Sequence, residues 1–400
     1  MGLGLLGRGV GDAKFLAEHG ADLIVTDLKT ESELAESMAQ LSGASNIMFR
    51  LGGHDLKDFR DRDFVLKAAG VPFDSPYVAE ARKNGIPIKM SASWFAELAE
   101  IKTVGVTGTR GKTTTTYMLY DIMRAGGLDV LLGGNIRGVS TLALLDRVTP
   151  QSVALMELDS WQCQGWGEEQ MSPNVAVFTT FMRDHMNYYH DDMQVYLLDK
   201  AQIFLYQKAE DTLVVSDQVV PQLDQFKLSA RTHVRVARAG ALELSVLGAH
   251  NQLNAACALE AARALGIDDA VSLKALKEFK GVPGRLELIR EVNGVKFYND
   301  TTATTPDATL AALEALGVEK TILIMGGTSK GLDMSALEAR LGELKKVVRI
   351  EQGLKEAVDE ARAVAHEGDV ILFSPAYASF GMFRNEYDRG DQFEKIVASL

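Results

Sequence analysis

The sequence predicts an α/β protein of three domains, in which parallel sheets are covered by helices on both faces. Short apolar runs of strand length, such as residues 23–26, 64–68, 104–106 and 321–325, alternate with helical stretches along the chain. A chain of 400 residues has the length of two or three ordinary domains. The breaker pair Pro283-Gly284 marks a natural boundary before the last block.

The predicted domains are residues 1–98, 99–282 and 283–400. We expect the first and third to be Rossmann-like. We expect the second to be a P-loop ATPase-type domain around a parallel sheet, because it contains a glycine-rich loop between a strand and a helix.

A glycine-rich string opens the first domain. Residues 2–7 (GLGLLG) have the G-x-G-x-x-G spacing of a dinucleotide-binding turn, and Asp27 follows twenty residues after Gly7. Such a string alone is weak support for nucleotide binding. The strand that should precede it is not found, because the sequence begins at the turn itself. We therefore expect this sheet to lack its first strand.

The strongest local signal opens the central domain. Residues 105–114 (GVTGTRGKTT) follow the apolar run 104–106 and precede a predicted helix over 117–123. Glycines let backbone N–H groups curl round phosphate oxygens, Lys112 would reach the β- and γ-phosphates, and the Thr113 hydroxyl suits Mg²⁺. The loop departs from the common pattern, since its first glycine is displaced from position 106. A chance glycine turn is the alternative, and the strand–loop–helix context disfavours it.

Ionisable side chains follow two further predicted strands of this domain. Glu157 ends the run 153–156, and Asp184 and His185 come after the run 175–178. Carboxyl ends of parallel strands gather ligands, and a carboxylate there can hold the Mg²⁺ that neutralises phosphate charge. Taken singly, a strand-end glutamate is as often solvated, and a lone histidine is more often structural.

The ordered set of motifs resembles the Mur ligase family. Residues 108–113 (GTRGKT) have the form of that family's phosphate loop, and Asp159 replaces a serine in a later motif. The other matching segments occur in the family's order: residues 132–136, 157–162, 184–188, 248–255, 281–287, 298–300, 326–330 and 374–380. Because these segments cover nearly the whole chain, the resemblance is specific.

This resemblance implies an ATP-dependent amide ligase that adds glutamate to UDP-N-acetylmuramoyl-L-alanine through an acyl phosphate, in cytoplasmic peptidoglycan precursor synthesis. It implies two Mg²⁺ sites, ATP as co-substrate and a CO₂-derived carbamate on Lys200, a residue otherwise best explained as lying on a helix surface. The implied catalytic residues are Lys112, Glu157, His185 and Lys200. The implied metal ligands are Thr113, Glu157, His185 and the carbamate of Lys200.

The family's remaining contacts carry over to three groups of residues. The ATP-binding residues would be Gly108, Thr109, Arg110, Gly111, Lys112, Thr113, Thr114, Asn251, Asn254, Arg285 and Asp300. The UDP-substrate residues would be Gly4, Leu5, Asp27, Leu28, Lys29 and Asn135. The glutamate-binding residues would be Thr304, Lys330 and Ser379.

The amino-acid pocket departs from the family pattern at two positions. Thr302 stands where the family has a lysine, and Glu386 stands where an aromatic residue contacts the glutamate chain. We expect Glu386 to point outward, Tyr387 to fill its place, and Lys330 to become the main cation for the substrate. The sequence leaves D- or L-glutamate open, and the resemblance favours the D form.

Composition excludes several other classes. The net charge of −12 argues against nucleic-acid binding, because a phosphate backbone requires clustered cations. No apolar run is long enough to span a bilayer, and the two cysteines suit a reducing cytoplasm. We expect a monomer acting on small molecules, without a nucleic-acid or membrane partner.

Three alternatives remain. A folylpolyglutamate synthetase shares the phosphate loop, but it begins with the ATPase domain. An NAD-binding dehydrogenase leaves the phosphate loop and the Lys200 region unexplained. A non-catalytic nucleotide-binding partner would not need Lys112, Glu157, His185 and Lys200 together.

Overall fold

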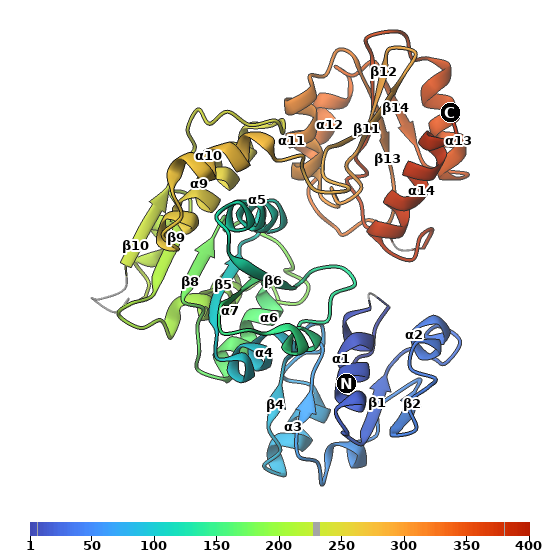
Figure 1. Cartoon of the computed structure of the whole chain (residues 1–400). Helices are drawn as coiled ribbons and strands as arrows, with labels where there is room; N and C mark the ends of the chain where they lie inside the picture. The colour runs from blue at the N-terminus through green and yellow to red at the C-terminus, as the bar shows by residue number, and fades with distance from the viewer. Residues whose placement is uncertain (6, 227–232, 380) are drawn as a thin grey trace. The chain divides into compact units, whose positions relative to one another are not determined.

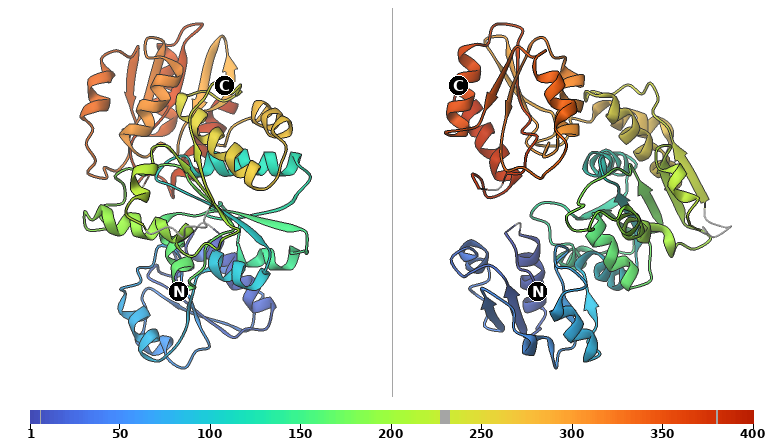
Figure 2. Two further views of the ribbon diagram at one scale, coloured as in Figure 1. Left: turned by 90° about the vertical axis from the view of Figure 1, so that its left-hand side faces the viewer. Right: turned by 180° about the vertical axis from the view of Figure 1, so that it is seen from behind.

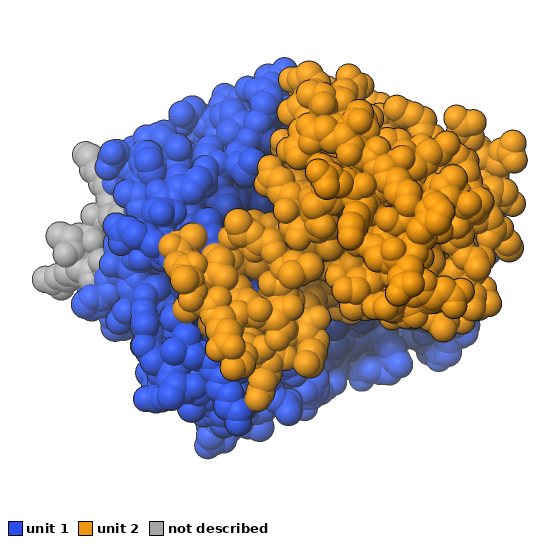
Figure 3. All heavy atoms as spheres, turned by 90° about the horizontal axis from the view of Figure 1, so that it is seen from above, with its two compact units in different colours: residues 1–238, 253–275 blue, residues 239–252, 276–400 orange. Residues whose placement is uncertain are grey.

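The computed structural model describes residues 1–5, 7–226, 233–379 and 381–400 (Figure 1). The chain divides into two compact units, coloured separately in Figure 3. Unit 1 comprises residues 1–238 and 253–275, and unit 2 comprises residues 239–252 and 276–400. The division into three domains at residues 98 and 282 stays a prediction.

The first part of unit 1 contains two small parallel sheets, β1 with β2 and β3 with β4. Its elements are α1 (Arg8–Glu18), β1 (Leu23–Asp27), α2 (Ala35–Ala39), β2 (Ile47–Leu51), η1 (Leu56–Phe59), β3 (Val65–Leu66), α3 (Pro76–Lys83), β4 (Ile88–Lys89) and α4 (Ser91–Ala99). No strand precedes α1 in the residues that the structure describes here. Residues 1–3 instead run between β1 and β3, with Gly2 donating to Thr26 and Ala68 donating to Met1.

A six-stranded parallel sheet, of strand order β10-β9-β8-β5-β7-β6, forms the centre of unit 1. Its strands are β5 (Lys102–Thr107), β6 (Asp129–Gly134), β7 (Ser152–Glu157), β8 (Val175–Phe178), β9 (Thr212–Ser216) and β10 (His233–Ala237). All residues of β7 and β8 are buried. Continuous apolar runs form these strands because helices cover both faces of the sheet.

The helices of this sheet are α5 (Lys112–Ala125), η2 (Leu142–Arg147), α6 (Ser160–Glu168), α7 (Met193–Leu205), α8 (Val220–Leu223), α9 (Ala249–Ala264) and α10 (Asp269–Glu278). Side chains of α4, α6 and α7 form one core with the sheet, including Phe95, Trp166 and Tyr196. The opposite face packs against α5, which buries Met118 and Leu119. No helix among the described residues is both long and apolar enough to cross a bilayer.

Unit 2 contains a five-stranded sheet between two helical layers (Figures 1 and 2). Its elements are β11 (Glu287–Val292), β12 (Val295–Asn299), α11 (Pro306–Leu316), β13 (Thr321–Met325), α12 (Ser335–Leu341), β14 (Lys346–Arg349), α13 (Leu354–Ala363), β15 (Val370–Phe373) and α14 (Glu386–Ala398). The helices α13 and α14 pack on one face. The helices α11 and α12 pack on the other.

One edge of the second sheet corrects the expectation of wholly parallel sheets. Strand β11 is antiparallel to β12, and the remaining pairs are parallel. The connecting residues Asn293 and Gly294 have φ values of 51° and 75°. Two successive positive φ values suit the two-residue hairpin turn that Asn-Gly favours. A hairpin turn makes the two strands that it connects antiparallel.

Candidate active site

The phosphate loop lies between the end of β5 and the start of α5. Gly111 has φ 84° and precedes the first helical residue, Lys112. A Cβ at Gly111 would overlap the side-chain oxygen of Asn254, and one at Gly108 would overlap the hydroxyl of Thr179. The loop therefore requires glycine at both positions, and its backbone lies at a helix N-terminus suited to an anion.

Two threonines that sequence reasoning missed hold this loop. Thr180 accepts from the Arg110 N–H at 2.8 Å, and its carbonyl accepts from the Thr109 N–H at 2.7 Å. The Thr179 hydroxyl donates to the Arg110 carbonyl at 2.5 Å. Both residues directly follow β8, which pairs with β5. Their position after a neighbouring strand was the only signal that could have indicated this role.

Two lysines converge on one carbonyl oxygen of the loop. Lys112 Nζ lies 3.0 Å and Lys200 Nζ lies 2.9 Å from the Gly108 oxygen. Lys200, on α7, is 1% exposed, so the surface-helix alternative is wrong. Burial, together with the nearby charge of Lys112, lowers the pKa of Lys200 to about 7. The structure thus brings two predicted catalytic lysines to the same loop.

Glu157 ends β7, beside the strand that leads into the loop. It pairs in register with Val106 and is 3% exposed. Its Oε1 accepts from the Asn135 amide at 3.3 Å, whereas its buried Oε2 has no hydrogen-bond partner among the residues described. A buried carboxylate oxygen without a donor is costly, and a bound cation would satisfy it.

Asp184 and His185 lie across the loop from Glu157's strand, after β8. Asp184 accepts from the Arg110 guanidinium at 2.7 Å. Burial alone would raise the pKa of Asp184, but the Arg110 and His185 charges hold it at about 2. His185 has φ 55°, and its ring centroid lies 4.8 Å from that of Trp161. Asp184 therefore remains ionised and fixes the Arg110 side chain beside the loop.

No group of three or more His, Cys, Asp or Glu side chains that could hold a metal occurs among the described residues. The predicted ligand set contains only Glu157 and His185 of these types. Magnesium commonly uses one or two protein carboxylates together with phosphate oxygens and water, so this set is of a suitable kind.

The glycine turn before α1 is tied to the end of β1 by Asp27. The carboxylate of Asp27 accepts from the Gly4 N–H at 3.0 Å and from the Lys29 N–H at 2.9 Å. Leu5 and Leu28 are 46% and 69% exposed. Asp27 thus holds the backbone of the predicted UDP site in place. The side chains of Leu5 and Leu28, next to these bonded residues in the sequence, are exposed.

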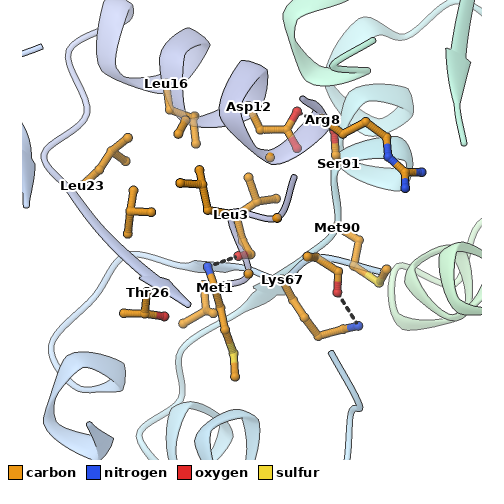
Figure 4. A pocket seen from close by; sticks show the side chains of 18 of the residues that line it. Met1, Leu3, Arg8, Asp12, Leu16, Leu23, Thr26, Lys67, Met90 and Ser91 are labelled. Carbon is orange, nitrogen blue, oxygen red and sulfur yellow. Dashed lines mark hydrogen bonds between the residues drawn. The ribbon is translucent and has the colours of Figure 1, made fainter. Parts of the chain in front are cut away.

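Arg8, which Figure 4 shows at the start of α1, is linked through Asn135 to Glu157 of the phosphate-loop site, and sequence reasoning missed this link. Its guanidinium donates to the Asn135 side-chain oxygen. Asn135 in turn donates from its backbone and its side chain to Glu157. The UDP-side turn and the carboxylate of Glu157 are therefore joined through Asn135.

The two predicted nucleotide asparagines lie on α9. Asn254 is buried beside Gly111 and belongs to unit 1. Asn251 belongs to unit 2, where its amide donates to the Leu247 carbonyl. Five further residues of the predicted sites belong to unit 2: Arg285, Asp300, Thr304, Lys330 and Ser379.

Asp300 is buried and directly follows the carboxyl end of β12. Ser374 donates to one of its oxygens at 2.7 Å, and the Leu286 N–H donates to the other at 3.0 Å. Burial raises the pKa of Asp300 to about 7, although these two donors and the Arg285 charge oppose the rise. The carboxylate thereby joins the segment after Arg285 to β15.

The segments that carry the predicted glutamate-binding residues lie close together in unit 2. Lys330 Nζ donates to the Thr304 hydroxyl at 2.9 Å. Thr328 and Ala378 form an antiparallel bridge, which brings the Lys330 and Ser379 segments side by side. The buried Ser379 hydroxyl has no hydrogen-bond partner in the described part of the chain. A cation and an unpaired hydroxyl on adjoining segments suit a carboxylate ligand.

Thr302 and Glu386, the two residues that differ from the family pattern, take part in hydrogen bonds within unit 2. The Thr302 hydroxyl donates to the Gly284 carbonyl at 3.0 Å. Glu386 is the first residue of α14, and its backbone carbonyl accepts from the Thr301 hydroxyl at 2.8 Å. The expectation that Tyr387 replaces Glu386 in the pocket stays a prediction.

Comparison with known proteins assigns the chain to a family. Residues 106–241 match the Mur ligase middle domain, and residues 284–377 match the Mur ligase glutamate ligase domain. A UDP-N-acetylmuramoylalanine–D-glutamate ligase of Roseiflexus sp. (strain RS-1) is 35% identical over 100% of this chain and 98% of its own length. The chain belongs to the Mur ligase family. A ligase of the same name from Borreliella afzelii (strain PKo) is 33% identical over 100% of this chain and 97% of its own.

Solved structures confirm the α/β fold of this Mur ligase. The UDP-N-acetylmuramate–alanine ligase MurC of Thermotoga maritima has a TM-score of 0.61 and 20% identity, covering 98% of this chain and 97% of that one. A pseudomurein peptide ligase type C of Methanothermus fervidus has a TM-score of 0.57 and 19% identity, with the same coverage. Mur ligases use ATP and Mg²⁺ generally, so both are expected reagents of this chain.

Proposed function

We propose that this Mur ligase joins D-glutamate to the alanyl carboxylate of UDP-N-acetylmuramoyl-L-alanine, with ATP as co-substrate, in cytoplasmic synthesis of a peptidoglycan precursor. Relatives that match the full chain are named for this reaction. The observation that carries the proposal is the phosphate loop with Lys112 and Lys200 on one carbonyl and Glu157 beside it.

In the proposed reaction, the γ-phosphoryl group of ATP passes to the alanyl carboxylate, which gives an acyl phosphate and ADP. The amine of D-glutamate then attacks the acyl carbon, an amide bond forms and inorganic phosphate leaves. The loop N–H groups and the helix N-terminus of α5 would hold the phosphates, and Lys112 would leave Gly108 to neutralise them. The protein's contribution is mainly positioning and charge.

Mg²⁺, when bound, would supply further positive charge to the phosphate oxygens. Thr113 and Glu157 would hold one ion, and the unpartnered Oε2 of Glu157 fits this role. His185 and a carbamate on Lys200 would hold the second. The Lys200 amine would add to CO₂ and release one proton, which converts a buried amine into an oxygen ligand next to the loop.

The UDP moiety would lie on the turn before α1. The N-terminus of α1 and the Gly4 backbone would receive the diphosphate. Leu5, Leu28 and Lys29 would surround the uracil, with Asp27 holding the loop in shape. Asn135 would contact the muramoyl part, since it already lies beside Glu157.

A substrate panel scored by phosphate release tests the proposed function. Release should require ATP, UDP-N-acetylmuramoyl-L-alanine and glutamate together, and D-glutamate should exceed L-glutamate. A folate acceptor with L-glutamate should give only background. Equal release without the muramoyl substrate would exclude this ligase assignment.

Lys330 is proposed as the main cation for the glutamate substrate. Lys330→Ala should weaken D-glutamate binding roughly 10- to 150-fold, because a charge-assisted hydrogen bond is worth ~1.5–3 kcal/mol. The measurement is KM for each glutamate enantiomer at saturating ATP. Lys320→Ala, at an exposed lysine in the same unit, is the matched control. Unchanged KM for the preferred enantiomer in Lys330→Ala would refute this role.

A further inference from the structure

The chain leaves the sheet of unit 2 toward different faces at neighbouring strands. Strand β15 leads to α14 on one face, whereas its neighbours β12 and β13 lead to α11 and α12 on the other (Figure 1). Segments that leave neighbouring parallel strands toward opposite faces diverge, and open α/β sheets bind ligands in the crevice at such a point. The residues proposed for glutamate, Thr304, Lys330 and Ser379, follow these three strands.

One buried arginine of α14 bonds to two of the diverging segments. Arg389 is 0% exposed, and its guanidinium donates to the Thr301 carbonyl at 2.7 Å and to the Thr301 hydroxyl at 3.2 Å. The same guanidinium donates to the Tyr377 carbonyl at 3.2 Å. Thr301 lies three residues before Thr304, and Tyr377 lies two residues before Ser379. Arg389 therefore holds together the segments that carry both hydroxyls.

The contact between α14 and the end of β12 places Arg389 at this position. A Cβ at Gly390 would lie 2.6 Å from the Thr301 methyl group, so a glycine is needed for the helix to approach this closely. The Thr301 hydroxyl also donates to the Glu386 carbonyl at 2.8 Å, in the first turn of the same helix. Because both contacts fix the helix against Thr301, they also fix the direction of the Arg389 side chain.

The charge of Arg389 is not matched by a bonded carboxylate. Each of its hydrogen bonds in the described part of the chain goes to a carbonyl or hydroxyl oxygen. Burial lowers the pKa of Arg389 to about 10, and the Glu386 charge opposes this shift, so the side chain stays charged at neutral pH. A buried cation without a carboxylate partner is costly, and the carboxylates of a nearby ligand would offset part of that cost.

We propose that Arg389 is a positioning residue for the amino-acid substrate, because it fixes the spacing of the segments that present the Thr304 and Ser379 hydroxyls to one dicarboxylate. The identity of that substrate rests on the proposed function. Arginine suits this task because its planar guanidinium reaches several acceptors in fixed directions, whereas lysine carries one charge on a flexible chain. Arg389 acts through the two segments and does not itself contact glutamate.

Two substitutions at Arg389 test this role: Arg389→Lys keeps the charge but loses the planar fork, and Arg389→Met loses both. KM for D-glutamate should rise at least about 10-fold in Arg389→Met and by a smaller factor in Arg389→Lys, because the two segments lose their common donor. KM for ATP should stay within about twofold, since the bonds of Asp300 do not involve Arg389. Lys395→Ala, at an exposed lysine of the same helix, is the matched control.

A buried arginine can also be needed for folding, so Thr301→Val provides a second test. Valine keeps the shape of the side chain and removes the hydroxyl that Arg389 contacts. KM for D-glutamate should rise severalfold in Thr301→Val, and Thr301→Ser, which restores the hydroxyl, should recover the parent KM. Loss of folded protein alone would lower the apparent kcat and leave KM unchanged.

A folded Arg389→Met or Thr301→Val enzyme with the parent KM for D-glutamate would overturn the proposal. An equal rise in KM for ATP would do the same, because it would indicate a general disturbance of unit 2. A parent chain that releases no phosphate with glutamate would instead contradict the proposed function, so the two failures are distinguishable.

Discussion

Replacing Lys112 with alanine should lower substrate-dependent phosphate release by at least ~10²-fold. The variant loses the cation that the loop would direct to the transferring phosphoryl group, where charge develops in the transition state. Lys112 donates to two carbonyls of its own loop, at 3.0 and 3.2 Å. Thr179 and Thr180 also hold the loop, so its backbone should persist in the variant. Initial rates at saturating ATP, muramoyl substrate and D-glutamate provide the measurement.

The matched control for this variant is Lys102→Ala, an exposed lysine that begins the strand leading into the same loop. It should retain the parent rate and melting temperature. A Lys112→Ala protein that is folded and turns over at more than a tenth of the parent rate would remove Lys112 from the proposed mechanism.

Lys200→Ala should be nearly inactive, and added formate or acetate should restore part of its rate. The proposed carbamate supplies an oxygen ligand beside the phosphate loop, and a small carboxylate can enter the space that the side chain leaves. Phosphate release should rise with carboxylate concentration in Lys200→Ala and stay flat in the parent. Mass measurement of the parent under CO₂ should show the added carbamate, which Lys200→Ala lacks.

Since Lys200 is buried, its removal also creates a cavity, and packing must be separated from chemistry. Lys200→Met fills nearly the same volume without an amine, so it should melt close to the parent and still be inactive. Lys208→Ala, at an exposed lysine just after α7, should be fully active. Normal turnover by Lys200→Met would show that the lysine has only a packing role.

Patterns of buried strands made part of the first unit predictable, whereas β2, β4, β6, β9 and β10 were not predicted. The apolar runs at 153–156 and 175–178 are strands β7 and β8, because both faces of a parallel sheet are covered. The antiparallel edge β11 was missed, although Asn293-Gly294 is the strongest short-range hairpin signal. Strand β3, at Val65–Leu66, is shorter than the predicted run 64–68, because only these two residues pair with β4.

Residues that touch the loop from distant segments could not be predicted from the sequence. Thr179 and Thr180 lie about 70 positions from Arg110, and Arg8 lies 127 positions from Asn135. Neither pair has a local pattern, because the contacts depend on which strands become neighbours. Glu157 could be predicted because a strand end is recognisable locally, whereas its unpaired Oε2 is a property of the packed site.

The threonine pair after β8 makes the phosphate loop a preorganised receptor. Ordering one residue on binding costs ~1–2 kcal/mol of backbone entropy. The Thr109 and Arg110 backbones are instead already fixed by Thr180, and the Arg110 carbonyl by Thr179. Nucleotide association therefore requires no coupled folding of this loop. Substitutions at Thr179 or Thr180 would return that entropic cost to the binding step, and so weaken nucleotides whose own contacts are unchanged.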